Sequence, residues 1–151
     1  MVYYYVDEGN HEVATRKGIA WLIREARTAG GGWIAVPHLS NMEAIARYRG
    51  FSAFKILTKP PHRGVINGLF LKLVSQNSLP DDFDDQAVLA IFPSADLLDR
   101  LHSIPGTSKM LAVPWSRIEI ESWIERTKAK VHEGPSARTH MTRTAVNESQ
   151  S

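Results

Sequence analysis

The sequence predicts a three-layer α/β domain, with a mainly parallel sheet between two layers of helices. Two observations support this class. Short apolar runs alternate along the chain with segments whose apolar residues recur at the 3.6-residue spacing of a helix, and the connections between them are short. A hairpin signal, Asn67-Gly68, breaks this alternation between two apolar runs. The pattern as a whole is typical of a Rossmann-like or flavodoxin-like domain.

The first third of the chain is expected to supply two strands and two helices. Val2–Val6 is apolar and rich in Tyr and Val, as in a buried strand, and Asn10 is expected to cap the helix that follows. The elements expected in chain order are a strand over Val2–Val6, a helix over His11–Thr28, a strand over Trp33–Val36, and a helix from Met42 to Arg49 that resumes through Phe54 and Leu57.

Three consecutive glycines, Gly30, Gly31 and Gly32, follow the first helix and precede the second strand. Phosphate-binding glycines have the reverse order, because they follow a strand and open a helix. Glycine after a helix instead accepts the left-handed conformation that ends it. The three glycines are therefore predicted to join helix and strand, at the edge of the sheet opposite any ligand site.

The second part of the chain opens with the hairpin, which is expected to be an insertion that adds an antiparallel edge. Asn-Gly supplies the two positive φ angles of a type I′ turn. The acidic segment that follows, Asp81–Asp85, is expected to be a solvated loop, which Phe83 pins to the core. The remaining elements are a strand over Val88–Phe92, a helix with Leu97, Leu98 and Leu101, a strand over Met110–Val113, and a helix with Ile120, Trp123, Ile124 and Thr127. Residues 1–132 are predicted to form one domain, and Glu133–Ser151 a disordered polar tail.

Composition limits the classes of function. The chain has 151 residues, no cysteine and a net charge of +2. The missing cysteines exclude disulfides and thiolate chemistry. No apolar run approaches the roughly 20 residues that span a membrane, and the N-terminus lacks the pattern of a signal peptide. A cytoplasmic protein without a membrane segment is therefore expected.

A pattern recurs at three strand ends. The segments WIAVPHLSNMEAI, LAIFPSADLL and LAVPWSRIEI each contain an apolar strand that ends in proline, followed within three residues by a serine and then by a helix. Ser40 with Glu43, and Ser116 with Glu119, have the spacing of a capping box. Ser94 is expected to cap the third helix, with Asp96 in its first turn. Well-capped helices alone would explain the pattern.

The same strand ends are the expected place for a ligand, because open parallel sheets bind ligands beyond the carboxyl ends of their strands. A small anionic ligand would contact helix-start amides there, and Trp115 would stack on a flat ring. His38 is a weak candidate general base, which Asp7 or Glu8 on the neighbouring strand would orient. The candidate ligand-binding residues are Asn10, His38, Ser40, Asn41, Ser94, Trp115 and Ser116, and the weak catalytic candidates are Asp7 and His38.

Three classes of function stay open. A non-catalytic binding or interaction module leads, because no catalytic motif is recognisable; its partner would be a small anion at the strand ends, or a second copy or another protein at the hairpin edge. A hydrolase or phosphotransfer enzyme would use Asp7 and His38. A nucleic-acid binder would use a basic helix and the C-terminal tail, without support from a motif. No cofactor is identified, and no metal site is expected. The cations of that helix are Arg16, Lys17, Arg24 and Arg27.

Overall fold

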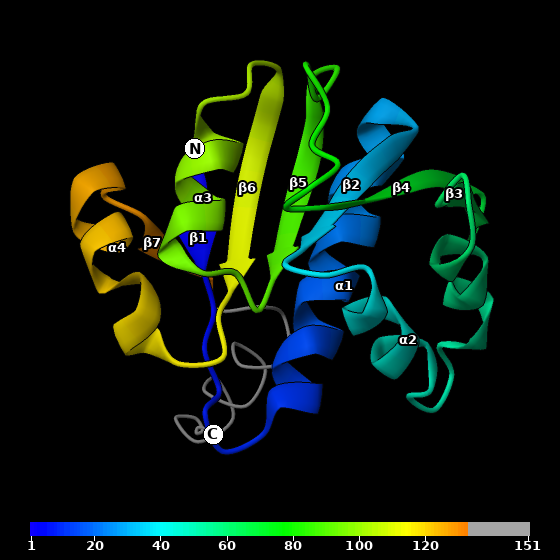
Figure 1. The fold of residues 1–151 in the computed structure, drawn as a ribbon, viewed down its shortest axis with the longest axis horizontal. Helices are drawn as coiled ribbons and strands as arrows, with labels where there is room; N and C mark the ends of the chain where they lie inside the picture. Colours follow the sequence, from blue (N-terminus) through cyan, green and yellow to red (C-terminus); the bar gives the residue numbers. More distant parts are fainter. Residues whose placement is uncertain (133–151) are drawn as a thin grey trace, which may run out of the picture.

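A seven-stranded sheet forms the centre of the structure, a computed structural model that describes residues 1–132 (Figure 1). Its strands lie in the order β3-β4-β2-β5-β6-β1-β7, and neighbouring strands are parallel except for β3 and β4. The elements are β1 (Val2–Tyr4), α1 (His11–Ala29), β2 (Gly31–Val36), α2 (Ser40–Ala46), the 3₁₀ helix η1 (Ser52–Thr58), β3 (Arg63–Ile66), β4 (Leu69–Ser75), β5 (Gln86–Ile91), α3 (Ala95–His102), β6 (Thr107–Val113), the 3₁₀ helix η2 (Arg117–Ile120), α4 (Glu121–Thr127) and β7 (Lys130–Val131). The predicted tail, Glu133–Ser151, lies outside the described residues.

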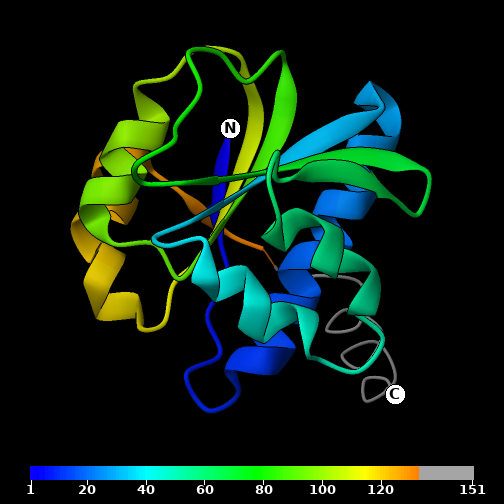
Figure 2. The same cartoon turned by 45° about the vertical axis from the view of Figure 1, so that its right-hand side comes forward.

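Helices cover both faces of this sheet. α1, α2 and η1 pack on one face, where Leu22, Ile45 and Leu57 are buried. α3 and α4 pack on the other face, where Leu98 and Trp123 are buried. Figure 2 shows the two helical layers on opposite sides of the sheet. The predicted mixed α/β class with a mostly parallel sheet is therefore confirmed, and the arrangement is consistent with a Rossmann-like fold.

The glycines divide between two roles. Gly30 ends α1 with a left-handed φ of 82°, and its amide donates to the Ala26 carbonyl at 2.7 Å, as predicted for a C-cap. Gly31 and Gly32 instead belong to β2. A Cβ on Gly31 would collide with the Phe70 carbonyl oxygen, and one on Gly32 would come within 2.8 Å of the Leu22 side chain. β2 therefore starts two residues earlier than expected. Its first two residues are glycines because the Phe70 backbone and the Leu22 side chain leave no room for a Cβ.

Two other predicted elements differ from the structure. β1 is shorter than the expected strand, and its residues are half-buried rather than buried because it lies near the edge of the sheet. Its outer neighbour is the short strand β7, which was not predicted. β7 is held to β1 in part by the His132 amide, which donates to the Tyr4 carbonyl at 2.8 Å. The expected continuation of the second helix is the 3₁₀ helix η1, separate from α2.

β3 and β4 form an antiparallel pair joined at Asn67 and Gly68, whose φ angles are 53° and 77°. β3 is an edge strand of the sheet, whereas β4 lies inside it and pairs in parallel with β2.

The strand order contains a switch point between β2 and β5. After β2 the chain continues toward the β3 edge of the sheet. The chain after β5 leaves in the opposite direction, through α3, to reach β6. β2 and β5 are therefore adjacent strands whose connections diverge, and such a switch point is where open α/β sheets bind ligands.

Candidate functional site

The switch point brings two of the predicted strand ends together. β2 and β5 are parallel neighbours, so His38 after β2 and Ser94 after β5 follow strands that end at the same edge of the sheet. We call this edge, where β1, β2, β4, β5 and β6 end, the carboxyl edge. The β6 strand ends there too, immediately before Pro114 and Trp115.

The start of α3 has the predicted cap. The Ser94 hydroxyl oxygen accepts a hydrogen bond from the Leu97 amide at 3.1 Å, while the Ser94 backbone stays extended. Asp96 lies in the first turn, where its carboxylate pairs with Arg100 at 3.1 Å and accepts from the Gln76 amide group at 3.2 Å. The first turn of α3 is therefore well defined in position.

An aromatic cluster lies beside this helix start and consists of His11, Phe92 and Trp115. The His11 and Trp115 rings stack with 3.4 Å between centroids and 9° between planes. Phe92 meets the Trp115 ring edge-on at 5.1 Å and the His11 ring at 6.1 Å. The cluster is open to solvent at Trp115, because 52% of that residue is exposed. The carboxyl edge thus presents the ring of Trp115, whose orientation is fixed by contacts with His11 and Phe92.

Backbone geometry holds the cluster in place. Phe92 has a φ of 54°, in the left-handed region that residues with a side chain seldom adopt. Its amide donates to the Val113 carbonyl at 2.7 Å, which ties the end of β5 to the end of β6. The His11 Nε2 lies 2.9 Å from the Trp115 carbonyl oxygen and donates to it. Of these three residues only Trp115 was predicted, although the position of His11 directly after the cap of α1 is a signal for the edge.

The helix start near Ser116 already has anionic partners. The Glu8 carboxylate accepts from the Arg117 amide at 3.0 Å and lies 3.5 Å from the Ser116 hydroxyl. Glu119 accepts from the Ser116 amide at 3.2 Å, which is the glutamate half of the predicted capping box. A hydrogen bond and the charge of Tyr4 raise the pKa of the nearby Arg117. The groups that an anion would contact at Ser116 are thus occupied by side chains of the chain itself.

The predicted cap at Ser40 is wrong. Ser40 is the first residue of α2 rather than the residue before it, and the preceding Leu39 makes no side-chain cap. Asn41 turns back instead, and its side-chain oxygen accepts from the His38 amide at 3.0 Å. The loop between β2 and α2 is therefore closed by Asn41, and α2 begins without a side-chain cap.

The expectation that Asp7 lies on the strand next to that of His38 is also wrong. β5 and β6 lie between β1 and β2, so the two strands are three sheet spacings apart, about 14 Å. The alternative orienting group, Glu8, bonds to the start of η2. The strand order therefore does not place the proposed catalytic pair at the ends of neighbouring strands.

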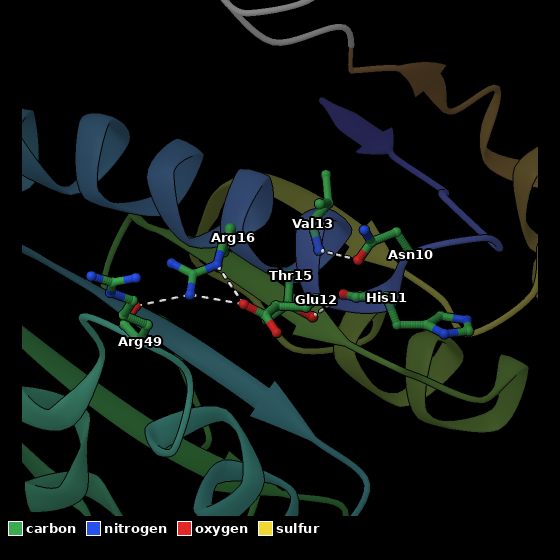
Figure 3. A network of polar contacts seen from close by, with 7 residues as sticks. All are labelled: Asn10, His11, Glu12, Val13, Thr15, Arg16 and Arg49. Carbon is green, nitrogen blue, oxygen red and sulfur yellow. Dashed lines mark hydrogen bonds and ion pairs between the residues drawn. The ribbon is translucent and has the colours of Figure 1, made fainter.

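The start of α1 is shown in Figure 3. The Asn10 side chain accepts from the Val13 amide at 3.1 Å and caps the helix as predicted. Arg16 pairs with Glu12 at 2.8 Å and donates to the Arg49 carbonyl at 2.8 Å. Part of the basic face of α1 is thus used within the chain.

Burial lowers the pKa of His132, and the charge of Arg24 on α1 lowers it further.

The acidic segment packs as a structured loop. Phe83 is fully buried, as predicted, and packs against Trp33, whose indole Nε1 donates to the Phe83 carbonyl oxygen at 3.1 Å. Asp82 accepts from the Asp84 amide at 2.6 Å. Within residues 1–132 no group of three or more His, Asp or Glu side chains is placed to hold a metal ion. In the same range no helix has the length and apolar character to cross a bilayer.

Comparison of the chain with protein families, with curated proteins and with solved structures finds no match.

Proposed function

We propose that this chain is a non-catalytic binding domain, which holds a small ligand with an aromatic ring and an anionic group at the carboxyl edge. The ring would stack on Trp115, and the anionic group would face the start of α3 at Ser94. We further propose that β3 and β4 are a hairpin inserted into a Rossmann-like domain.

The aromatic cluster is the observation that carries the proposal. A tryptophan that only closed the core would be covered, whereas half of Trp115 is open while its inner side rests on His11. A ring held in one orientation loses little conformational entropy when a ligand stacks on it. The strained backbone of Phe92, which supports the cluster, is the kind of feature that recurs at ligand sites.

The start of α3 supports the anionic part. Ser94 is two residues from Phe92, so it lies within about 7 Å of that residue along the chain. Ser94 caps only the Leu97 amide, and the other amides at the start of a helix lack intrahelical partners and attract negative charge. Asp96 weakens this attraction, but Arg100 balances its charge at 3.1 Å. One small molecule is therefore long enough to contact both the ring and the helix start.

Tryptophan fluorescence tests the proposal, because Trp115 is exposed while Trp21, Trp33 and Trp123 are buried. Adenosine monophosphate should quench the emission and raise the melting temperature; adenosine should do so more weakly, and inorganic phosphate should not quench. Trp115→Leu should abolish the quenching, while Ile118→Ala at a nearby exposed position should keep it. A nucleotide panel that leaves both emission and melting temperature unchanged would overturn the proposal.

The edge strand β3 offers a second surface for the same class of function, a contact with another copy or another protein. Its backbone groups on one side have no neighbouring strand within the described residues, and Val65 is 66% exposed. Sedimentation across a range of protein concentrations tests this contact, and Val65→Lys should favour the monomer if it exists.

A further inference from the structure

We infer that a cavity between α2 and η1 binds a small polyanion, such as a molecule with two linked phosphate groups. This α2–η1 cavity has a volume of about 440 Å³ and is separate from the carboxyl-edge residues described above. α2 and η1 pack side by side, as Figure 2 shows for the two short helices after β2. The residues that line the cavity are Glu43, Ala46, Arg47, Lys55, Thr58 and Lys59.

The charges of the lining residues carry the inference. Arg47, Lys55 and Lys59 meet a single carboxylate, Glu43, which leaves an excess of two positive charges. In the part of the chain that the structure describes, none of these four side chains forms an ion pair. Cations that face one cavity repel one another, and an anion between them removes that repulsion.

The positions of the cations near helix ends do not account for the cavity. Arg47 follows α2 directly, Lys55 is in the last turn of η1, and Lys59 follows η1. Each cation is favourable there because it faces the negative end of a helix. That effect places each residue near its own helix end, but it does not require the three to line one cavity.

The walls of the cavity are fixed by the core beneath them. Ala46 is 4% exposed and lies on the buried side of α2, while Phe54 and Leu57 anchor η1. The Thr58 hydroxyl donates to the Lys55 carbonyl at 2.7 Å and closes the last turn of η1. The cationic groups therefore extend from a rigid frame, and binding needs only the ends of the side chains to become ordered.

The size and chemistry of the cavity indicate the class of ligand. Small-molecule sites occupy about 300–1,000 Å³, and the cavity lies in the lower part of that range. Guanidinium and ammonium groups form charge-assisted hydrogen bonds with phosphate oxygens. A compact ligand with several negative charges fits this arrangement, and it needs no aromatic ring because no aromatic residue lines the cavity.

Titration with inorganic pyrophosphate, followed by calorimetry at low ionic strength, tests the inference. Arg47→Gln with Lys55→Gln should weaken binding roughly ten-fold, because two charge-assisted contacts are lost from exposed groups. Arg27→Gln with Lys130→Gln removes the same number of charges elsewhere and should change binding by less than about two-fold. Glu43→Gln removes the opposing carboxylate and should tighten binding by about two- to three-fold. Lys130 lies on β7, and the other substituted side chains extend from helices or turns on the surface. Thermal melts will verify that each variant folds.

Three results would overturn the inference. The first is a wild-type protein that does not bind pyrophosphate. The second is equal weakening in the two double variants, which would show a general effect of charge. The third is a single-stranded RNA oligonucleotide that binds through Arg47 and Lys55 far more tightly than pyrophosphate does, which would assign the cavity to nucleic acid. Pyrophosphate should leave the Trp115 emission unchanged, so this result is read independently of the carboxyl-edge proposal.

Discussion

The carboxyl edge and the α2–η1 cavity differ in how their polar groups are satisfied. At the edge, Glu8, Asn41 and Ser94 each accept a hydrogen bond from a backbone amide of the chain itself. In the cavity, Arg47 and Lys55 form no ion pair within the described residues. The edge has its own internal anion, whereas the cavity has an excess of positive charge.

This difference predicts two kinds of recognition. A ligand at the edge would gain most from the exposed ring of Trp115, so its affinity should depend weakly on salt. A ligand in the cavity would gain from charges near the surface, and its affinity should fall steeply as ionic strength rises. Salt dependence is therefore the property that separates the two surfaces in solution.

The largest expected effect comes from the core residues that support each surface. Leu98 supports α3 at the edge and Leu57 supports η1 at the cavity, and both are fully buried. Each substitution to alanine should lower the free energy of unfolding by about 2–5 kcal/mol, because it removes apolar contacts and leaves a cavity. Urea unfolding measures both, with Ile118→Ala as the exposed control, which should change stability by less than about 0.5 kcal/mol. If Leu98→Ala or Leu57→Ala lowers the free energy of unfolding as little as the control does, the surface above that residue has no rigid support.

A smaller effect is expected at the start of α3. Ser94→Ala removes the acceptor for the Leu97 amide and should lower the free energy of unfolding by about 1 kcal/mol. Ser122→Ala, on the exposed side of α4, is the matched control. Equal melting temperatures for the two variants would mean that the cap does not hold the edge in place.

The Ser94 cap was predictable because every group that forms it is local. Ser94 follows the proline at the end of a strand, and its partner amide is three residues away. The same spacing failed at Ser40, since the chain already turns at Leu39, with φ −58° and ψ −30°, one residue too early for a cap. A capping box predicts the partners but not the backbone conformation that must precede the helix.

Features that depend on distant parts of the chain were not predictable. The separation of Asp7 from His38 follows from the order of the strands, which no local pattern fixes. Gly31 is required by the Phe70 carbonyl of another strand, and His11 acquires its role only because Trp115 stacks on it. The sequence thus located the edge of the sheet and some of its residues, whereas strand order and side-chain packing determined which of them meet.

The smallest of these stability effects is expected at Glu8, and this substitution tests directly whether Glu8 acts as the internal anion of the carboxyl edge. Glu8→Ala removes the carboxylate that accepts from the Arg117 amide, and it should lower the free energy of unfolding by roughly 0.5–1 kcal/mol because the bond is exposed. The Glu125→Ala variant, at an exposed position of α4, is the matched control.

The opened amides of η2 should then behave like the cationic cavity and attract a dissolved anion. Inorganic phosphate should raise the melting temperature of Glu8→Ala more than that of the wild type, and added sodium chloride should reduce the difference. Phosphate would thus replace the internal carboxylate, and the edge would gain the salt dependence that we assign to the cavity. An equal response to phosphate in Glu8→Ala and Glu125→Ala would show that Glu8 does not act as an internal anion, because its removal would then leave no site for phosphate to fill.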